Sequence, residues 1–474
     1  MRALAAGAPA PRPVKLAELL PGVDAWVVGG TVRDELLGRP VRDVDVAVDG
    51  DPEQPARAAA AALGGPVFPL SETFGAWRVI ERSTGRVYDF SPLQGETIDD
   101  DLGKRDFTVN AIARPLAGGE PVDPFGGRAD LEARTLRVLG RSAYESDPLR
   151  PLRLARFAAE LGFVPDLETE RLTVEAAPRT REAAGERVFA ELRRLLLAPG
   201  VLVGLELADR LGLLRAVLPE VAELHDVEQS HYHHLDVYGH TIEVLERQIE
   251  VEGRLDEIFG PLGTRVRAAV DEPLADELTR LQALRLGALL HDVGKPATRA
   301  VRPDGRITFM GHDRVGQEMI HGLCRRLRTS ERLSRFLGAL ARHHLRLGFL
   351  VHERPLDRRA VYRYLKLTTP VEVEVTLLSC ADRMATRGRN AARATRAHLD
   401  LARELMSAAL DWRTNGPPKV PVRGDDLGRE LGIEPGPEIG RLLAELEEAT
   451  YAGEARTRDE AVALARRLRE NSRT

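Results

Sequence analysis

One stretch of sequence, Gly29–Val48, constrains this chain more than any other. It follows the apolar run Trp26–Val28, which predicts a strand, and its two leading glycines allow the backbone to approach a ligand closely. Arg33 then lies at a predicted helix start. Asp43 and Asp45 alternate with valines, so in a strand both carboxylates point to the same side. Mg²⁺ takes one or two carboxylates together with substrate phosphates, so the stretch indicates nucleoside triphosphate chemistry.

The length and composition predict a cytoplasmic, globular protein of two to four domains. A chain of 474 residues is too long for one ordinary core, and no apolar run approaches the length of a membrane span. The N-terminal segment lacks the apolar core of a secretory signal, and the two cysteines predict buried thiols in a reducing compartment. The net charge of −5 argues against nucleic-acid binding by overall charge but leaves a local basic surface open.

The order of the predicted elements divides the chain into a mixed α/β head and a helical body. Strands are expected over 77–81 and 86–90, joined as a hairpin by Ser-Thr-Gly, and again over 108–114. Beyond about residue 140 the strand signals nearly vanish, and helices are expected over 147–163 and 185–197. We therefore predict an α+β protein whose small mixed sheet lies in the N-terminal part.

A second polar element spans residues 99–113. Lys104 and Arg105 precede the strand expected there, and Asp106 and Asn110 lie at its start. These side chains could belong to a charged loop that enters an apolar strand. The functional alternative places a cation and hydrogen-bonding groups beside a bound nucleotide.

A third element consists of Asp147, Arg150, Arg153 and Arg156, spaced three residues apart. On a helix this spacing makes successive side chains neighbours. Asp147 and Arg150 could then present a carboxylate and a guanidinium to the edge of a base. The plainer alternative is an exposed helix with ordinary ion pairs.

Together these elements resemble the bacterial-type (class II) tRNA nucleotidyltransferases and their poly(A) polymerase relatives. The resemblance covers roughly residues 24–200. The family motifs stand here as GGTVRD (29–34), DVD (43–45), KRDFTVNA (104–111), SDPLR (146–150) and ERVFAEL (186–192). Two positions depart from the family pattern, because Lys104 replaces an arginine and Ser146 replaces a glutamate.

The resemblance implies templateless addition of C or A to an RNA 3′ end. The terminal hydroxyl of the primer attacks the α-phosphate, and pyrophosphate leaves. Asp43 and Asp45 would be the catalytic residues and bind Mg²⁺, while Asp147 and Arg150 would select the base. The matching positions imply a nucleotide site formed by Gly29, Gly30, Arg33, Arg105, Asp106, Asn110, Asp147, Arg150, Arg153 and Arg156.

The interval between the strand ending at Phe90 and Asp101 bears on which nucleotides are added. It contains only residues 91–100. Full CCA-adding relatives carry a longer, flexible loop here, implied in the switch from C to A addition, whereas relatives that add only CC are shortened. The resemblance therefore favours a CC-adding enzyme. A full CCA-adding enzyme, a poly(A) polymerase, and a metal phosphohydrolase whose head only binds nucleotide or RNA are the alternatives.

A second candidate metal site lies in the helical body. His240, His291-Asp292 and Asp382 occur in the order H…HD…D that is typical of the HD phosphohydrolase superfamily. Such ligands suit a divalent transition metal such as Ni²⁺ or Mn²⁺, which can activate water toward phosphate esters. The resemblance implies hydrolysis of 2′,3′-cyclic phosphates or 2′-nucleotides. His312 and His343 are candidates for a second metal position, whereas His231, His233 and His234 are expected to be surface or packing residues.

We predict four domains from these observations. They are a nucleotidyltransferase head over 1–140, a helical neck that binds nucleotide and RNA over 141–230, an HD phosphohydrolase-like domain over 231–400 and an RNA-binding helical tail over 401–474. The expected partners are a tRNA that lacks a complete 3′ CCA end, and CTP, with ATP as a second nucleotide. No membrane partner is expected.

Overall fold

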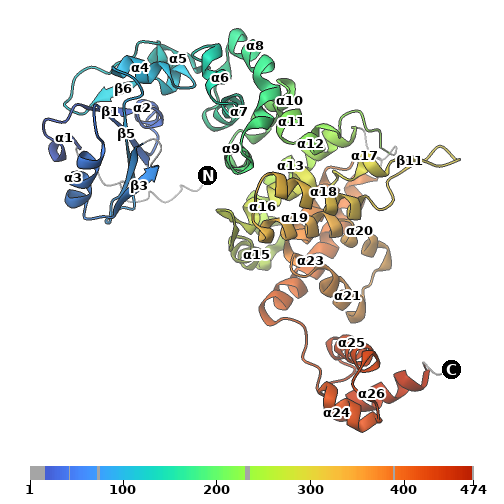
Figure 1. Cartoon of the computed structure of the whole chain (residues 1–474). Coiled ribbons are helices and arrows are strands. Elements are labelled where there is room, and N and C mark those ends of the chain that lie inside the picture. Colours follow the sequence, from blue (N-terminus) through green and yellow to red (C-terminus); the bar gives the residue numbers. More distant parts are fainter. Residues whose placement is uncertain (1–15, 42, 72–74, 230–234, 388–389, 472–474) are drawn as a thin grey trace. The chain divides into compact units, whose positions relative to one another are not determined.

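The computed structural model describes residues 16–41, 43–71, 75–229, 235–387 and 390–471 (Figure 1). The chain forms two compact units. The first comprises residues 1–183 and 191–217, and the second comprises residues 184–190 and 218–474. Mixed sheet and helix in the N-terminal part, followed by helices, confirm the predicted α+β class. Among the described residues, no helix is both long and apolar enough to cross a membrane.

The first unit contains a six-stranded mixed sheet with the order β3-β4-β5-β2-β1-β6. Only the β2–β5 pair is parallel, and the other pairs are antiparallel. Alternate burial along β2 follows its sequence pattern, because Val44, Val46 and Val48 are buried while Asp43 is exposed. The strands are β1 (Ala25–Val28), β2 (Asp43–Val48), β3 (Val67–Ser71), β4 (Ala76–Ile80), β5 (Val87–Pro92) and β6 (Ala113–Pro115).

The hairpin expected from residues 77–90 is confirmed, but the strand expected over 108–114 is largely wrong. Trp77 pairs with Phe90 in the antiparallel β4–β5 ladder. Thr108–Asn110 instead form the 3₁₀ helix η1, and only β6 follows as a strand. Thr108 Oγ1 donates a 2.6 Å hydrogen bond to Asp130 Oδ2, and Asn110 Nδ2 donates to Asp106 Oδ1 at 2.8 Å. Such side-chain bonds favour a turn over a regular ladder.

The helices of the first unit follow the sheet in the chain and also connect its strands. The helix expected over 147–163 begins only at Arg150, because Pro151 stands in its first turn and Asp147 has an extended backbone. The helices are α1 (Leu16–Leu19), α2 (Gly30–Leu36), α3 (Glu53–Leu63), α4 (Ile98–Gly103), α5 (Gly127–Ala133), α6 (Arg141–Ser146), α7 (Arg150–Leu161), α8 (Leu167–Ala176), η2 (Ala177–Glu182), α10 (Val201–Arg210) and α11 (Leu213–Val217). The short strands β7 (Thr135–Leu136) and β8 (Val164–Pro165) pair in parallel. Helix α9 (Gly185–Leu197) has the predicted bounds.

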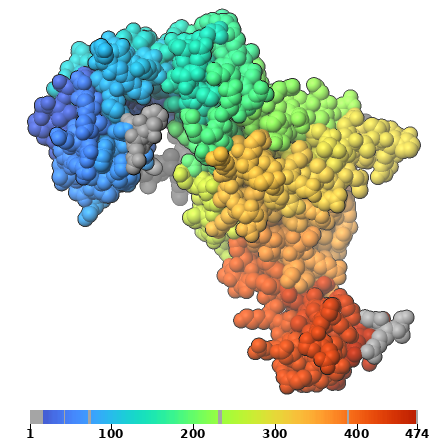
Figure 2. Space-filling model, in the orientation of Figure 1, coloured from blue at the N-terminus to red at the C-terminus, as the bar shows by residue number. Residues whose placement is uncertain are grey.

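Within its described residues, the second unit is helical except for two small ribbons. Helix α16 (Arg280–Leu290) packs against α13 (Val237–Gly253), α19 (Glu331–His343) and α22 (Glu372–Met384), and most of its residues are buried. A Cβ on Gly287 would lie 2.5 Å from Leu340 Cδ1, so this glycine permits the close approach of α19. The ribbons are β9 (Pro273–Ala275) with β10 (Leu278–Thr279), and β11 (Ala300–Val301) with β12 (Ile307–Thr308). The latter ribbon projects from its unit (Figure 2).

The remaining elements of this unit complete the helical body and its tail. They are α12 (Pro219–Ala222), α14 (Leu255–Phe259), η3 (Gly260–Leu262), α15 (Gly263–Val270), α17 (Lys295–Thr298), α18 (His312–Arg326), α20 (Arg346–Leu350), η4 (Val351–Glu353), α21 (Arg358–Thr368), α23 (Ala391–Asn415), α24 (Gly424–Leu431), α25 (Pro437–Ala452) and α26 (Arg458–Asn471). The last three helices share a hydrophobic cluster that includes Leu427, Leu442 and Val462.

Candidate active sites

The glycine pair forms a tight turn between β1 and α2. Gly29 has a φ of +68°, which L side chains rarely adopt, and a Cβ there would lie 2.6 Å from Arg105 Nη1. Helix α2 starts at Gly30, directly after this turn. Position 29 therefore favours glycine, since its backbone conformation strains any L side chain and a Cβ there would displace the end of the Arg105 side chain.

Thr31 joins this turn to the acidic strand β2. Its Oγ1 accepts a 3.0 Å hydrogen bond from the Asp45 backbone N–H and donates a 3.2 Å bond to the Asp43 carbonyl. The side chain is buried. Thr31 thus fixes the position of both acidic residues relative to the glycine turn. The motifs do not predict this role, since a threonine inside a helix start carries no chemical signal by itself.

The two acids of β2 lie in a strongly acidic environment. Burial raises the pKa of Asp45, and the neighbouring carboxylates of Asp89 and Asp43 raise it further, while Arg105 opposes the rise. Asp89 is the partner of Asp45 in the parallel β2–β5 register. Arg78 on β4 donates two hydrogen bonds of 2.8 and 2.7 Å to the Asp89 carboxylate. Carboxylate oxygens gathered on adjacent strands are the kind of ligand that Mg²⁺ prefers.

The second and third elements meet in a chain of polar contacts. Arg33 Nη1 donates to Asn110 Oδ1 at 2.7 Å, and Asn110 Nδ2 donates to Asp106 Oδ1 at 2.8 Å. Arg153 Nη2 lies 3.0 Å from Asp106 Oδ2. The guanidiniums of Arg33 and Arg153 lie 5.1 and 5.6 Å from the ring centre of Phe157. These contacts hold two arginines from distant parts of the sequence on one wall.

Arg105 and Arg150 are also held by the protein. Arg105 Nε and Nη2 donate to Asp101 Oδ2 at 3.2 and 2.8 Å. The Arg150 guanidinium donates to the carbonyls of Arg105 and Ala143, each at 3.1 Å, and to that of Lys104 at 2.7 Å. Arg150 thus holds the segment that carries Arg105, an additional role that its spacing in the sequence did not indicate.

The residues of these elements line one cavity of about 500 Å³. The single exception among the predicted residues is Asp147, which precedes α7 instead of lying on it, so the helical spacing expected from Asp147 to Arg150 is wrong. Arg156 reaches the cavity, but it also forms buried ion pairs with Glu160 and Glu191. The predicted residues in the lining are Gly29, Gly30, Arg33, Asp43, Asp45, Arg105, Asp106, Asn110, Arg150, Arg153 and Arg156.

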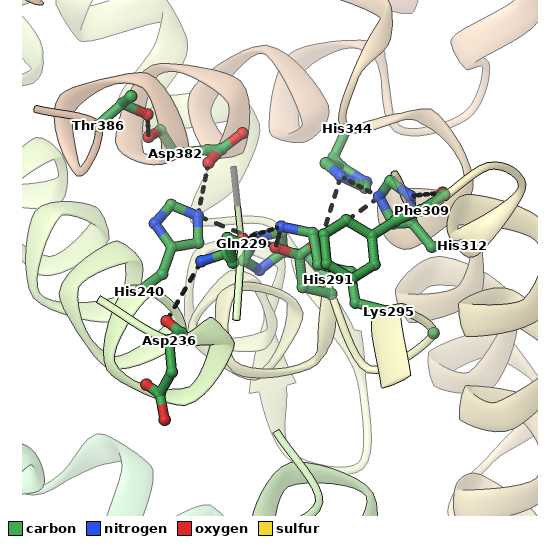
Figure 3. A network of polar contacts seen from close by, with 12 residues as sticks. Gln229, Asp236, His240, His291, Lys295, Phe309, His312, His344, Asp382 and Thr386 are labelled. Carbon is green, nitrogen blue, oxygen red and sulfur yellow. Dashed lines mark hydrogen bonds and ion pairs between the residues drawn. The ribbon is translucent and has the colours of Figure 1, made fainter. Parts of the chain in front are cut away.

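In the second unit, residues distant in sequence bring imidazoles and carboxylates together (Figure 3). His240 on α13 and Asp382 on α22 lie 3.1 Å apart, measured from Nε2 to Oδ1. His291 caps the C-terminal end of α16, and its Nε2 lies 3.0 Å from Asp292 Oδ2. Lys295 Nζ lies 2.7 Å from the same oxygen and donates to Gln229 Oε1 at 2.7 Å. The predicted residues His240, His291, Asp292 and Asp382 therefore share one site.

Two further histidines complete the cluster. His312 and His344 lie with Asp292 in a group of possible metal ligands, and His240, His291 and Asp382 form another. The expectation for His312 agrees with this geometry, but the contributing residue of the 343–344 pair is His344, not His343. Adjacent helical residues point about 100° apart, so only one of the two can face the centre. Residues 231, 233 and 234 lie outside the described part of the chain.

The charge states of Asp382 and His344 suit metal binding. Burial would raise the pKa of Asp382, but the hydrogen bond from His240 and the nearby imidazoles hold it well below its ordinary range. Burial lowers the pKa of His344 to about 4, so this imidazole is neutral at pH 7. Ionised carboxylates and neutral imidazoles are the forms that bind divalent metals. The adjoining cavity measures about 480 Å³ and is lined in part by Phe349, Val351, His352, Arg383 and His398.

Comparison with protein families matches three parts of the chain. Residues 25–137 match the poly(A) polymerase head domain. Residues 162–224 match the probable RNA and SrmB-binding site of polymerase A. Residues 237–387 match the HD domain.

Similar proteins extend over nearly the whole chain. It is 38% identical to an A-adding tRNA nucleotidyltransferase of Deinococcus radiodurans over 94% of this chain and 96% of the relative. It is 36% identical to a CC-adding tRNA nucleotidyltransferase of Thermus thermophilus over 93% of each. A solved CCA-adding enzyme of Thermotoga maritima complexed with tRNA shares the fold, with a TM-score of 0.59, 23% identity, and coverage of 95% of this chain and 92% of that one.

Proposed function

Since the chain belongs to the family of tRNA nucleotidyltransferases that add C or A at the 3′ end, we propose that it adds CC, using CTP. The observation that carries this proposal is the connection between β5 and α4, which consists only of residues 93–97. Its backbone is held locally, because Asp101 Oδ1 accepts from the Gln94 N–H at 3.0 Å and Asp100 Oδ2 from the Thr97 N–H at 3.0 Å. A connection this short contains no flexible loop for a switch to A addition.

Sequence identity does not decide between CC and A addition. The A-adding and CC-adding relatives match the chain almost equally well, at 38% and 36%. The short connection therefore carries the proposal by itself. A poly(A) polymerase is disfavoured, since the HD match continues the likeness to tRNA nucleotidyltransferases through the second unit.

We assign the chemistry of the head to residues of its cavity. Asp43 and Asp45 would hold Mg²⁺, which when bound neutralises the charge that develops on the phosphates. Arg33 and Arg105 face the same cavity and would bind the triphosphate. Their existing contacts to Asn110 and Asp101 orient both guanidiniums before the nucleotide enters.

Base selection would use the donors that the backbone contacts of Arg150 leave over. Its guanidinium carries five N–H groups and donates three of them to backbone carbonyls, so two remain to read a base edge together with Asp147. We propose that the tRNA is bound along the neck, residues 141–230, and the tail, residues 401–474. The match of residues 162–224 to a probable RNA-binding site supports the first of these assignments.

The decisive experiment is an analysis of product ends. A tRNA transcript without CCA is incubated with CTP and ATP, and its 3′ ends are sequenced. We expect products that end in CC, and a terminal A would refute the CC-only specificity. The Asp43→Ala, Asp45→Ala double variant serves as the control, because it must lose all incorporation while the HD cluster stays intact. Retained CTP incorporation in this variant would refute the proposed head site.

We further propose that the HD cluster is a metal-dependent phosphohydrolase for 2′,3′-cyclic phosphates. The supporting observation is the convergence of imidazole and carboxylate ligands beside an accessible cavity. A metal held there supplies an activated water. We expect hydrolysis of a 2′,3′-cyclic nucleotide with added Ni²⁺ or Mn²⁺, and its loss in His291→Ala. Full hydrolysis by that variant would refute the assignment. His343→Ala is the matched control, since this histidine lies outside both ligand groups.

A further inference from the structure

The cavity beside the HD cluster is also lined by residues that are not candidate metal ligands. Phe349 on α20 and Arg383 near the end of α22 belong to this part of the lining, and His398 reaches it from α23. The match to the HD domain ends at residue 387, so His398 lies beyond it. The volume of about 480 Å³ is in the range of small-molecule sites. These residues can therefore contact a part of the substrate that the cluster does not hold.

Arg383 brings a guanidinium to the cavity that no described residue binds. Its Nε is shielded from solvent and has no hydrogen-bond acceptor among the described residues. The lining residue Lys295, in contrast, is already held by Asp292 and Gln229. Buried donors in folded proteins are nearly always paired, and a phosphate is an acceptor that suits the planar fork of arginine. Arg383 is therefore available to an anionic group of a ligand.

The histidine beside Arg383 is uncharged and leaves the guanidinium available. His398 Nε2 lies 3.0 Å from Ser379 Oγ, and both residues line the cavity. Burial lowers the pKa of His398 to about 4, and the nearby cation of Arg383 contributes to this fall, which Asp382 opposes. The imidazole is thus neutral at pH 7. The positive charge on this side of the cavity is that of Arg383, with a hydrogen-bonding imidazole next to it.

An aromatic ring completes this side of the cavity. Phe349 is 58% exposed, and the apolar residues Leu345 and Val351 lie in the same lining. Exposed aromatic rings serve as stacking platforms for nucleic-acid bases, whatever the base. An aromatic face and an unpaired guanidinium in one cavity suit a nucleotide, because its base is flat and its phosphates are anionic.

The position of Arg383 on α22 separates it from the metal ligands. Asp382 Oδ1 lies 3.1 Å from His240 Nε2, within the cluster. Adjacent helical residues point about 100° apart, so Arg383 enters the cavity to one side of Asp382. A ligand with one phosphate, held by the cluster, would leave this guanidinium without a partner. A ligand with a second phosphate would supply one.

We propose that the HD cavity binds a nucleotide through two phosphates. The cluster holds the 2′,3′-cyclic phosphate, Phe349 stacks on the base, and Arg383 binds a phosphate attached to the 5′ oxygen of the same nucleoside. The inference rests on the proposed phosphohydrolase for the identity of the first phosphate. Two kinds of molecule carry the second phosphate, namely an RNA chain that ends in a 2′,3′-cyclic phosphate and a 5′-phosphorylated mononucleotide.

The experiment compares three ligands of the full chain. They are adenosine 2′,3′-cyclic phosphate, the same nucleotide with a 5′ phosphate, and the dinucleotide ApA with a 2′,3′-cyclic phosphate end. Hydrolysis is measured with Mn²⁺, and binding is measured by calorimetry in EDTA, where the metal-dependent reaction does not run. The 5′ phosphate should raise kcat/KM and tighten binding by about 10- to 100-fold, the usual contribution of hydrogen bonds to a charged group.

The variants locate the second phosphate. Arg383→Gln should lose the preference for the 5′-phosphorylated ligand. Arg387→Gln should keep it, because this nearby arginine is exposed, pairs with Glu243 and lies outside the residues that line the cavity. Phe349→Ala should weaken the binding of all three ligands by a similar factor of about 5- to 100-fold, since each contains the stacked base.

The outcomes separate this inference from the proposed hydrolase. Hydrolysis without a preference for the 5′ phosphate, or a preference that persists in Arg383→Gln, overturns the inference and leaves the hydrolase standing. A preference in binding that depends on Arg383, without hydrolysis of any ligand, supports the inference and refutes the hydrolase.

The dinucleotide identifies the source of the second phosphate. A gain for the dinucleotide equal to that of the 5′-phosphorylated mononucleotide supports an RNA end, and a gain confined to the mononucleotide supports a free nucleotide. Circular dichroism identifies a misfolded Arg383→Gln variant. The exposed Phe349 then provides the test, because unchanged binding of all three ligands by Phe349→Ala would overturn the nucleotide site.

Discussion

Replacing Gly29 by alanine tests whether the glycine turn positions Arg105 for the triphosphate. The substitution has two effects that must be separated. It strains the backbone, which has φ 68° and ψ −133° at Gly29, and it places a Cβ 2.6 Å from Arg105 Nη1. Gly260 offers a matched control. Its φ of 55° and ψ of −126° are nearly the same, but a Cβ there meets nothing within 4 Å. Gly260→Ala therefore introduces the strain without the contact.

The structure sets the size of the expected effect. Both variants strain the backbone of their own unit by about 1–3 kcal/mol. In Gly29→Ala the guanidinium must also retreat by about 0.8 Å to reach the 3.4 Å of ordinary contact. Its two hydrogen bonds to Asp101 resist that movement. Misplacement of a binding group by about 1 Å costs up to about 100-fold, so we expect kcat/KM for CTP to fall about 10- to 100-fold, chiefly through KM.

The assay is the incorporation of labelled CTP into a tRNA transcript that lacks CCA, over a range of CTP concentrations. Thermal unfolding of each variant, followed by circular dichroism, sets a temperature at which both remain folded. Gly260→Ala should keep the kcat/KM of the wild type. If Gly29→Ala stays within about twofold of Gly260→Ala, the proposed positioning of Arg105 is refuted, since such a difference corresponds to less than about 0.5 kcal/mol.

Two further predictions concern buried charges. Burial would raise the pKa of Asp106, but Arg153 and the Asn110 hydrogen bond hold it below 3.8. The ionised Asp106 carboxylate therefore contributes fully to stability above pH 3.8, and this contribution is lost as the pH falls through the lowered pKa of the folded state. The difference in unfolding free energy between the wild type and Asp106→Asn should accordingly shrink in acid. A difference that does not depend on pH would contradict this prediction. Glu374 is fully buried between Arg413 and Arg280. The Glu374→Gln variant should lower the free energy of unfolding in urea by about 3–5 kcal/mol, because both arginines lose their shared buried carboxylate and keep only Glu372 and Glu272 as acidic partners. Glu257→Gln removes an exposed ion pair and should leave stability unchanged, so equal losses in the two variants would refute the reasoning.

The sequence by itself determined the order of the elements and most of the chemistry-bearing residues. Alternation of valine and aspartate predicted β2 and the common direction of Asp43 and Asp45, because strand periodicity is a local property. The hairpin of β4 and β5 and the bounds of α9 followed from equally local signals. The α+β class followed as well, since strand patterns are concentrated before residue 140.

Only the tertiary structure decided which side chains meet. The register of β5 against β2 placed Asp89 beside Asp45, and pairing between strands distant in sequence has no local signature. The contact of Thr31 with β2 depends in the same way on how α2 packs. The rotation of α19 about its axis turned His344 toward Asp292 and not His343. Neighbouring helical residues differ by about 100° in direction, so a pair of histidines in the sequence cannot show which one faces a centre that other helices build.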